Sequence, residues 1–128
     1  MSPRFLSIDE VVEIHRDQIE RYGGAGGIRD QGLLESALGQ PAAIFGDRFL
    51  HRDLYEMAAD LFHLVQNHPF QDGNKRVGAV AAIVFLDLND VELDLPEDEL
   101  ERLVMDVSQG RLGKVELTAS IRAFTRPR

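Results

Sequence analysis

The feature that most constrains the fold is a helical segment, from about Asn74 to Asn89, whose apolar positions nearly encircle it. A surface helix carries its apolar residues in one stripe, whereas a helix that is apolar on most sides must be surrounded by other elements. The apolar side chains here are Val77, Val80, Ala81, Val84, Phe85 and Leu88. Gly78, Ala79, Ala81 and Ala82 are small enough for close helix contacts. The pattern therefore predicts a central, buried helix.

The rest of the chain predicts further helices that can pack around this one. Ser7 and Glu10 have the spacing of a capping box, and the helix that they begin should end at Gly23-Gly24. The expected helices lie at about 7–22, 30–40, 54–67, 74–89, from Pro96 onward, and 117–124. The segment 91–95 alternates like a strand but has no obvious partner, so we expect an extended connector or a minor edge hairpin. The predicted fold is all-α, with six helices in one domain over residues 1–128.

Composition excludes several classes of protein. The formal net charge of −8 disfavours binding to the phosphate backbone of nucleic acids as a main function. No apolar run approaches the ~20 residues that cross a bilayer, and the N-terminus lacks the apolar stretch of a signal peptide, so we expect a cytoplasmic protein without a membrane partner. Without cysteine there is no thiolate nucleophile and no disulfide framework. An acidic cluster spans residues 92–101; we interpret it as a solvated helix start, with a docking face for a basic partner as the alternative.

The residues that carry chemistry are concentrated in the segment His68 to Arg76, directly before the buried helix. The first turn of a helix presents unsatisfied N–H groups and a partial positive charge, and Gly73 can adopt the left-handed backbone of an anion-binding nest. Lys75 and Arg76 add two cations at the same place. Asp72 would repel a bare phosphate, which suggests Mg²⁺ between them, and His68 is a natural general base. Together these residues predict group transfer from a nucleoside triphosphate to a hydroxyl.

Each feature of this segment also has a plain structural interpretation. His-Pro and Asp-Gly-Asn are ordinary turn sequences, and Lys75 with Arg76 could be a solvated first turn. These features occur together in nine residues, directly before a helix whose pattern predicts burial, which favours the functional interpretation. A zinc hydrolase is disfavoured, because the chain has no H-E-x-x-H motif, and a P-loop enzyme is excluded, because it has no G-x-x-x-x-G-K-[ST] sequence. His51 and His63 are given no role, and His15 is interpreted as a surface or satisfied helix residue.

The segment resembles the signature of the Fic/Doc family, whose Fic branch reads H-x-F-x-[D/E]-G-N-G-R-x-x-R. The matching positions are His68, Phe70, Asp72, Gly73, Asn74 and Arg76. Lys75 stands where the second glycine belongs and Ala79 where the last arginine belongs, and both departures are typical of the Doc, or "death on curing", branch of toxins. The segments 21–24, 27–38 and 84–89 also resemble Doc-like proteins, so the resemblance spans nearly the whole chain.

The resemblance implies a protein kinase that transfers the γ-phosphate of ATP to a threonine or serine hydroxyl, with elongation factor Tu as the implied target and translation arrest as the outcome. His68 would then be the base, Asp72 would hold Mg²⁺ or orient the substrate, and Phe70 would anchor the loop in the core. Gly73, Asn74, Lys75 and Arg76 would bind phosphates. An inhibitory [S/T]-x-x-x-E-[G/N] helix is not evident in the sequence, so an antitoxin of the Phd type, wrapping an exposed groove, is the implied partner.

Two matters stay open from the sequence. Arg29 and Asp30 are candidates for a flap that docks the target segment, and a helix N-cap with a turn explains them equally well. The activity also has two alternatives: transfer of AMP, as in the Fic branch, and a catalytically idle binding module.

Overall fold

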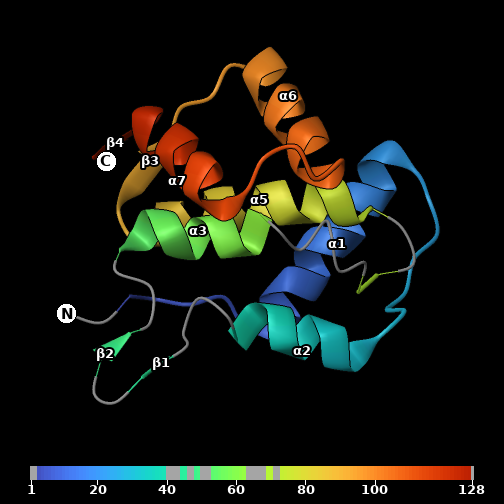
Figure 1. Ribbon diagram of the computed structural model, residues 1–128. Helices are drawn as coiled ribbons and strands as arrows, with labels where there is room; N and C mark the ends of the chain where they lie inside the picture. The colour runs from blue at the N-terminus through green and yellow to red at the C-terminus, as the bar shows by residue number, and fades with distance from the viewer. Residues whose placement is uncertain are drawn as a thin grey trace.

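In the computed structural model the chain is predominantly helical, as predicted (Figure 1). The structure describes residues 3–39, 44–45, 48–49, 53–62, 69–70 and 73–127. Of residues 44–45, 48–49 and Lys75 it describes the backbone alone. The helices in these ranges are α1 (Ile8–Tyr22), α2 (Gln31–Gly39), α3 (Leu54–Phe62), α5 (Asn74–Leu88), α6 (Glu97–Ser108) and α7 (Lys114–Ala123). The short strands are β1 (Ile44–Phe45), β2 (Arg48–Phe49), β3 (Val91–Leu93) and β4 (Thr125–Pro127). The all-α class and its six helices are confirmed over the described residues.

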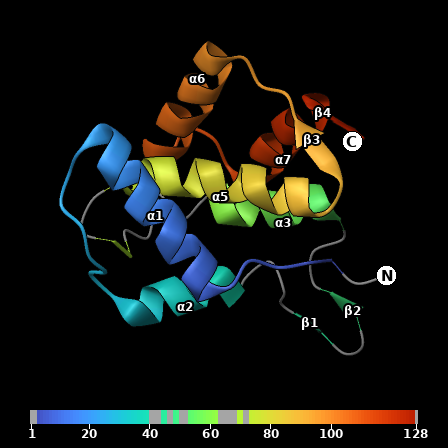
Figure 2. The ribbon, with the colours of Figure 1, turned by 180° about the vertical axis from the view of Figure 1, so that it is seen from behind.

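Helix α5 lies at the centre of the molecule, as its apolar pattern predicted. Figures 1 and 2 show α3 on one side of it, α1 on the other and α6 across a third, while α7 packs against α3. Val77, Ala81 and Phe85 on α5 are fully buried. Helix α5 approaches α3 closely at Gly78, where an added Cβ would lie 2.7 Å from the carbonyl oxygen of Phe62. That distance is shorter than van der Waals contact, so the small residue is what allows α3 and α5 to pack so closely.

The bounds of the other helices match the sequence with two differences. The capping box at the start of α1 is present, with Ser7 Oγ accepting from the Glu10 N–H and the Glu10 carboxylate accepting from the Ser7 N–H. The helix predicted over 54–67 is confirmed to Phe62, and residues 63–68 lie outside the described part of the chain. Helix α7 begins at Lys114 rather than near Leu117. Its first turn was missed because Val115 is 81% exposed, which breaks the apolar periodicity there.

The segment after α5 forms a strand whose partner comes from the end of the chain. β3 pairs antiparallel with β4, with Val91 opposite Pro127, Glu92 opposite Arg126 and Leu93 opposite Thr125. The Arg126 guanidinium lies within ion-pair distance of both Glu92 and Asp94. The expected connector or edge hairpin is therefore corrected to a two-stranded ribbon between distant segments. The pairing was not predictable because three residues ending in proline carry no strand pattern of their own.

An asparagine closes each end of α5 by bonding to the backbone of another segment. At the start, the Asn74 amide accepts from the Phe70 N–H and donates to the Phe70 carbonyl, each at 3.0 Å. At the end, the Asn89 amide accepts from the Arg4 N–H at 2.8 Å and donates to the Arg4 carbonyl at 2.9 Å. Asn89 Nδ2 also donates to the Phe85 carbonyl in the last turn. Each side-chain amide therefore bonds to both the N–H and the carbonyl of one residue in another segment, as the backbone of a neighbouring β-strand would.

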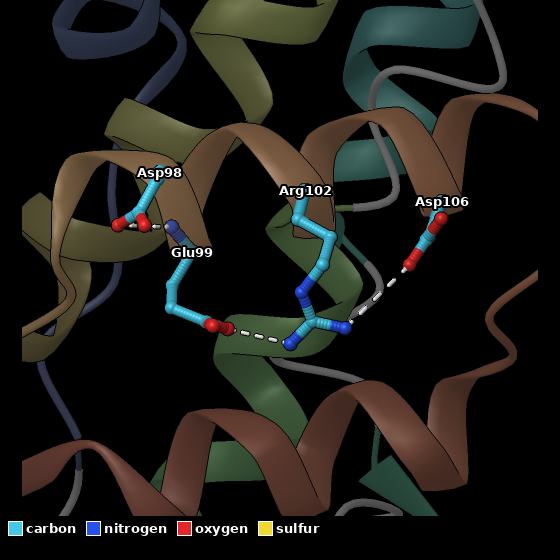
Figure 3. Close-up of polar contacts among 4 residues, drawn as sticks. All are labelled: Asp98, Glu99, Arg102 and Asp106. Carbon is cyan, nitrogen blue, oxygen red and sulfur yellow. Dashed lines mark hydrogen bonds and ion pairs between the residues drawn. The ribbon is translucent and has the colours of Figure 1, made fainter.

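Helix α6 carries much of the acidic cluster on its exposed side, as the solvated-helix interpretation predicted. Its first turn contains Glu97, Asp98 and Glu99, where carboxylates are favoured by the helix dipole. Figure 3 shows Arg102 lying between Glu99 and Asp106 along this face. The hydrogen bond to Glu99 and its negative charge raise the pKa of Arg102 above its usual value. Among the residues that the structure describes, no helix is long and apolar enough to cross a membrane.

Candidate active site

The predicted site is at the N-terminal end of α5, and the structure describes part of it. Pro69, Phe70, Gly73, Asn74 and Arg76 are described, as is the backbone of Lys75. His68 and Asp72 lie outside the described residues, as does the Lys75 side chain. Their predicted roles as base, metal ligand and phosphate-binding cation stay predictions. Within the described ranges no group of three His, Asp or Glu side chains gathers into a metal-binding arrangement.

Gly73 has the left-handed backbone conformation that the sequence predicted, with φ 78° and ψ 10°, and it is the N-cap of α5. The first helical hydrogen bond runs from the Val77 N–H to the Gly73 carbonyl at 3.0 Å. The N–H groups before Val77 have no acceptor within the helix, as at the start of every helix. A Cβ at Gly73 would also come within 3.3 Å of Ile19 Cδ1. Both the conformation and the available space therefore favour glycine here.

Asn74, predicted to bind phosphate, uses its side chain to fix the loop. Its two bonds to the backbone of Phe70 are buried, so they are protected from competition with water. One hydrogen remains on the side-chain nitrogen after these bonds are made. The structure therefore gives Asn74 a positioning role, and direct contact with a phosphate stays a prediction.

Phe70 anchors the loop in the core, as predicted, and is 1% exposed. Its ring stacks on that of His15 from α1, with 4.0 Å between the ring centroids and 8° between the planes. His15 is 4% exposed, so its interpretation as a surface residue is wrong and the satisfied-helix alternative is the one that fits. A signal was available in the spacing, because the buried residues of α1 are Val11, His15 and Gln18 at helical intervals.

The segment 28–30 holds the other side of the loop. Ile28 forms an isolated antiparallel bridge with Phe70, and the N–H groups of Arg29 and Asp30 both donate to the Pro69 carbonyl, at 2.8 and 3.0 Å. The Asp30 carboxylate accepts from the Leu33 N–H at 3.0 Å, at the start of α2. This is the N-cap interpretation of Asp30. Docking of a target by Arg29 and Asp30 stays a prediction.

Arg76 lies on the exposed side of the first turn of α5, next to the end of α1. Its guanidinium carbon is 4.7 Å from the centroid of the Tyr22 ring. A cation over an aromatic face at this distance is attracted by the ring's negative centre. Tyr22 is 61% exposed, so the pair stays open to solvent. The contact holds the Arg76 guanidinium near the N-terminal end of α5, where the helix dipole places its partial positive charge.

A groove of about 400 Å³ runs between α1 and the segment 26–28, with Phe70 at its floor. Its lining is mostly apolar, with Val12, Ile19 and Ile28 contributing, and Arg16 and Glu20 lie on the α1 side. The groove thus borders the anchored loop. Taken together, the described part of the site offers N–H groups that have no acceptor within the helix, a cation beside them, and an anchored Phe70. Such an arrangement is suited to holding an anion.

The chain belongs to the Fic/DOC family, whose sequence profile matches residues 5–86 and thus covers the site and α5 as far as Leu86. The chain is also similar to two proteins that carry the Doc name. It is 31% identical over 121 residues to "Protein kinase doc" of Escherichia phage P1, covering 93% of this chain and 94% of that protein. It is 35% identical over 106 residues to "Toxin Doc" of Mycolicibacterium smegmatis, covering 80% of this chain and 82% of that protein.

Proposed function

We propose that this protein is a Doc-like toxin that acts as a protein kinase, transferring the γ-phosphate of ATP to a threonine or serine hydroxyl of a translation factor. Elongation factor Tu is the target to test first. The observation that carries the proposal is the match to Doc proteins along most of the chain, one of which is named a protein kinase. The anchored loop at the start of α5 supports it, because phosphoryl transfer depends chiefly on positioning and electrostatic stabilisation.

The residues have complementary roles in this proposal. The N–H groups at the start of α5, with Lys75 and Arg76, would hold the phosphates. His68 would accept the proton of the target hydroxyl while its oxygen bonds to the γ-phosphorus and the bond to the β-phosphate oxygen breaks, leaving ADP. Mg²⁺, held by Asp72, would neutralise charge on the phosphate oxygens. Phe70 and Asn74 would keep His68 and Asp72 in place, because they fix the chain between these two residues in the sequence.

The position of Ala79 argues for phosphate transfer over AMP transfer. The Fic branch has an arginine at this position, where it helps to hold the triphosphate. In this chain Ala79 is 3% exposed, so its side chain cannot contact a nucleotide. AMP transfer is therefore an outcome of the test below and not a second proposal.

An antitoxin of the Phd type is part of the proposal, since a toxin without an internal inhibitor must be restrained by a partner in the same compartment, which we propose to be the cytoplasm. The groove between α1 and the segment 26–28 is the surface on which to test such binding. An apolar lining between charged residues suits an amphipathic segment.

Incubation of the protein with elongation factor Tu and ATP, followed by mass measurement of the target, tests the proposed function. Parallel reactions use ATP labelled at the γ-phosphate and at the α-phosphate, and His68→Ala is the control enzyme. We expect the target to gain one phosphate, with γ-label only, and expect no gain with His68→Ala. Transfer of the α-label would overturn the kinase proposal in favour of AMP transfer. Absence of both labels from elongation factor Tu and from a ribosome-containing extract would leave a binding module.

A further inference from the structure

We propose that His15 is a positioning residue of this site, and that its ring sets the orientation of Phe70 and so of the loop that carries the reactive groups. The inference rests on the proposed function for its kinetic consequence but on geometry alone for its structural one. His15 lies in the middle of α1, far from the loop in sequence, and no part of the motif around His68 includes it.

The imidazole ring of His15 stacks on Phe70 and lies close to Gly73. On one face it stacks on the Phe70 ring, nearly parallel, with 4.0 Å between centroids. At its edge it lies against Gly73, where an added Cβ would be 3.7 Å from both Cδ2 and Nε2. Phe70 and Gly73 immediately flank Gln71 and Asp72 in the sequence. The ring of His15 therefore packs on the residue before these two and lies close to the residue after them.

The contact complements the one made by Asn74. Asn74 bonds to the N–H and the carbonyl of Phe70 and so fixes its backbone. His15 contacts the ring of the same residue and so fixes its side chain. If Phe70 were held only by its two backbone hydrogen bonds, the residue could still rotate about the axis through them. The stacking of its buried ring on His15 prevents this rotation. Together the two contacts hold Phe70 through both its backbone and its side chain.

Stacking on Phe70 needs a flat ring but not the imidazole nitrogens. Two substitutions can therefore distinguish a positioning role of His15 from a chemical one. His15→Phe keeps the ring, and His15→Ala removes it. We expect His15→Ala to lower kcat for phosphate transfer by about 10- to 100-fold, as small displacements of reacting groups do. The KM for ATP should change much less, because the described phosphate-binding groups are on α5. His15→Phe should restore most of the lost kcat.

Val11→Ala is the matched control, because Val11 is fully buried on the same face of α1, one turn before His15. It weakens the packing of α1 and leaves the ring at position 15 in place. Assayed at a temperature where all variants are folded, Val11→Ala should keep the wild-type kcat. If Val11→Ala and His15→Ala lose kcat in proportion to their loss of stability, His15 is only a core residue and the proposal fails. If His15→Phe is folded but as inactive as His15→Ala, the imidazole acts chemically and the positioning role is wrong.

Hydrogen exchange of the Phe70 amide provides a readout that does not depend on activity. This amide donates to Asn74 Oδ1 in the buried loop. We expect its exchange to be faster in His15→Ala and close to wild type in His15→Phe and Val11→Ala. Wild-type exchange in His15→Ala would overturn the inference even if kcat fell. If the wild-type protein transfers no phosphate at all, the proposed function fails, and the exchange experiment still decides the role of His15.

Discussion

The two ends of α5 are held by the same chemical device, but they join it to very different parts of the chain. At the N-terminal end, Asn74 bonds to Phe70, four residues away, and at the C-terminal end Asn89 bonds to Arg4, 85 residues away. The first pair is buried and adjoins His15 and Gly73, whereas the bonds to Arg4 are exposed. Asn74 thus shapes a local loop, whereas Asn89 joins α5 to the N-terminal segment of the chain. Their replacement should therefore separate activity from stability.

The largest effect is expected for Asn74→Ala. It leaves the N–H and carbonyl of Phe70 buried without their partner, which should cost roughly 2–4 kcal/mol of stability. Because the loop loses its backbone anchor, kcat for phosphate transfer should fall about 100-fold. Urea unfolding and steady-state kinetics below the unfolding transition measure the two effects separately. A folded Asn74→Ala protein with wild-type kcat would show that the loop is set by other contacts.

Asn89→Ala is the counterpart and should affect stability alone. Its bonds to Arg4 are exposed, so water can replace them, and the loss should be about 1–2 kcal/mol. Since the change is at the far end of α5, kcat should stay at the wild-type value. The same urea and kinetic measurements apply. A fall in kcat comparable to that of Asn74→Ala would mean that the two ends of the helix are coupled, and the comparison would fail.

A smaller effect is expected at the rim of the site, for Tyr22→Leu. The ring of Tyr22 holds the Arg76 guanidinium near the start of α5. Without the aromatic face Arg76 samples more conformations, and the KM for ATP should rise about two- to fivefold, consistent with an exposed cation–π contact. Tyr22→Phe keeps the ring and should behave as wild type. An unchanged KM in Tyr22→Leu would indicate that Arg76 does not need this contact to bind phosphate.

The sequence predicted the parts of the fold that follow from periodicity. The central position of α5, the capping box of α1 and the left-handed Gly73 all depend on local patterns and backbone chemistry. The β3–β4 pairing did not follow, because the partners are decided by the packing of distant segments and not by either strand's own sequence. Patterns within a short segment do not indicate which distant segment it will pair with.

The candidate site shows the same division. The resemblance to the Fic/Doc family implied that Phe70 anchors the loop in the core, and Phe70 is buried. Its stacking partner His15 was missed, because the polar residues that follow it, Arg16 and Asp17, suggest a surface position. The role of Asn74 was also hidden. An asparagine at the start of a helix can bond to a ligand or to its own loop, and only the geometry shows that its amide is committed to Phe70.

The ribbon of β3 and β4 has a consequence for behaviour at high concentration. A two-stranded ribbon leaves two unpaired edges, which can recruit strands from other molecules and begin aggregation. Here the terminal strand ends in Pro127, which has no amide hydrogen to donate, and Arg126 places a charged side chain beside it. The acidic side chains of β3 and the segment after it add repulsion between like molecules. Strand β4 thus pairs with β3 and is poorly suited to pair with a strand of another molecule.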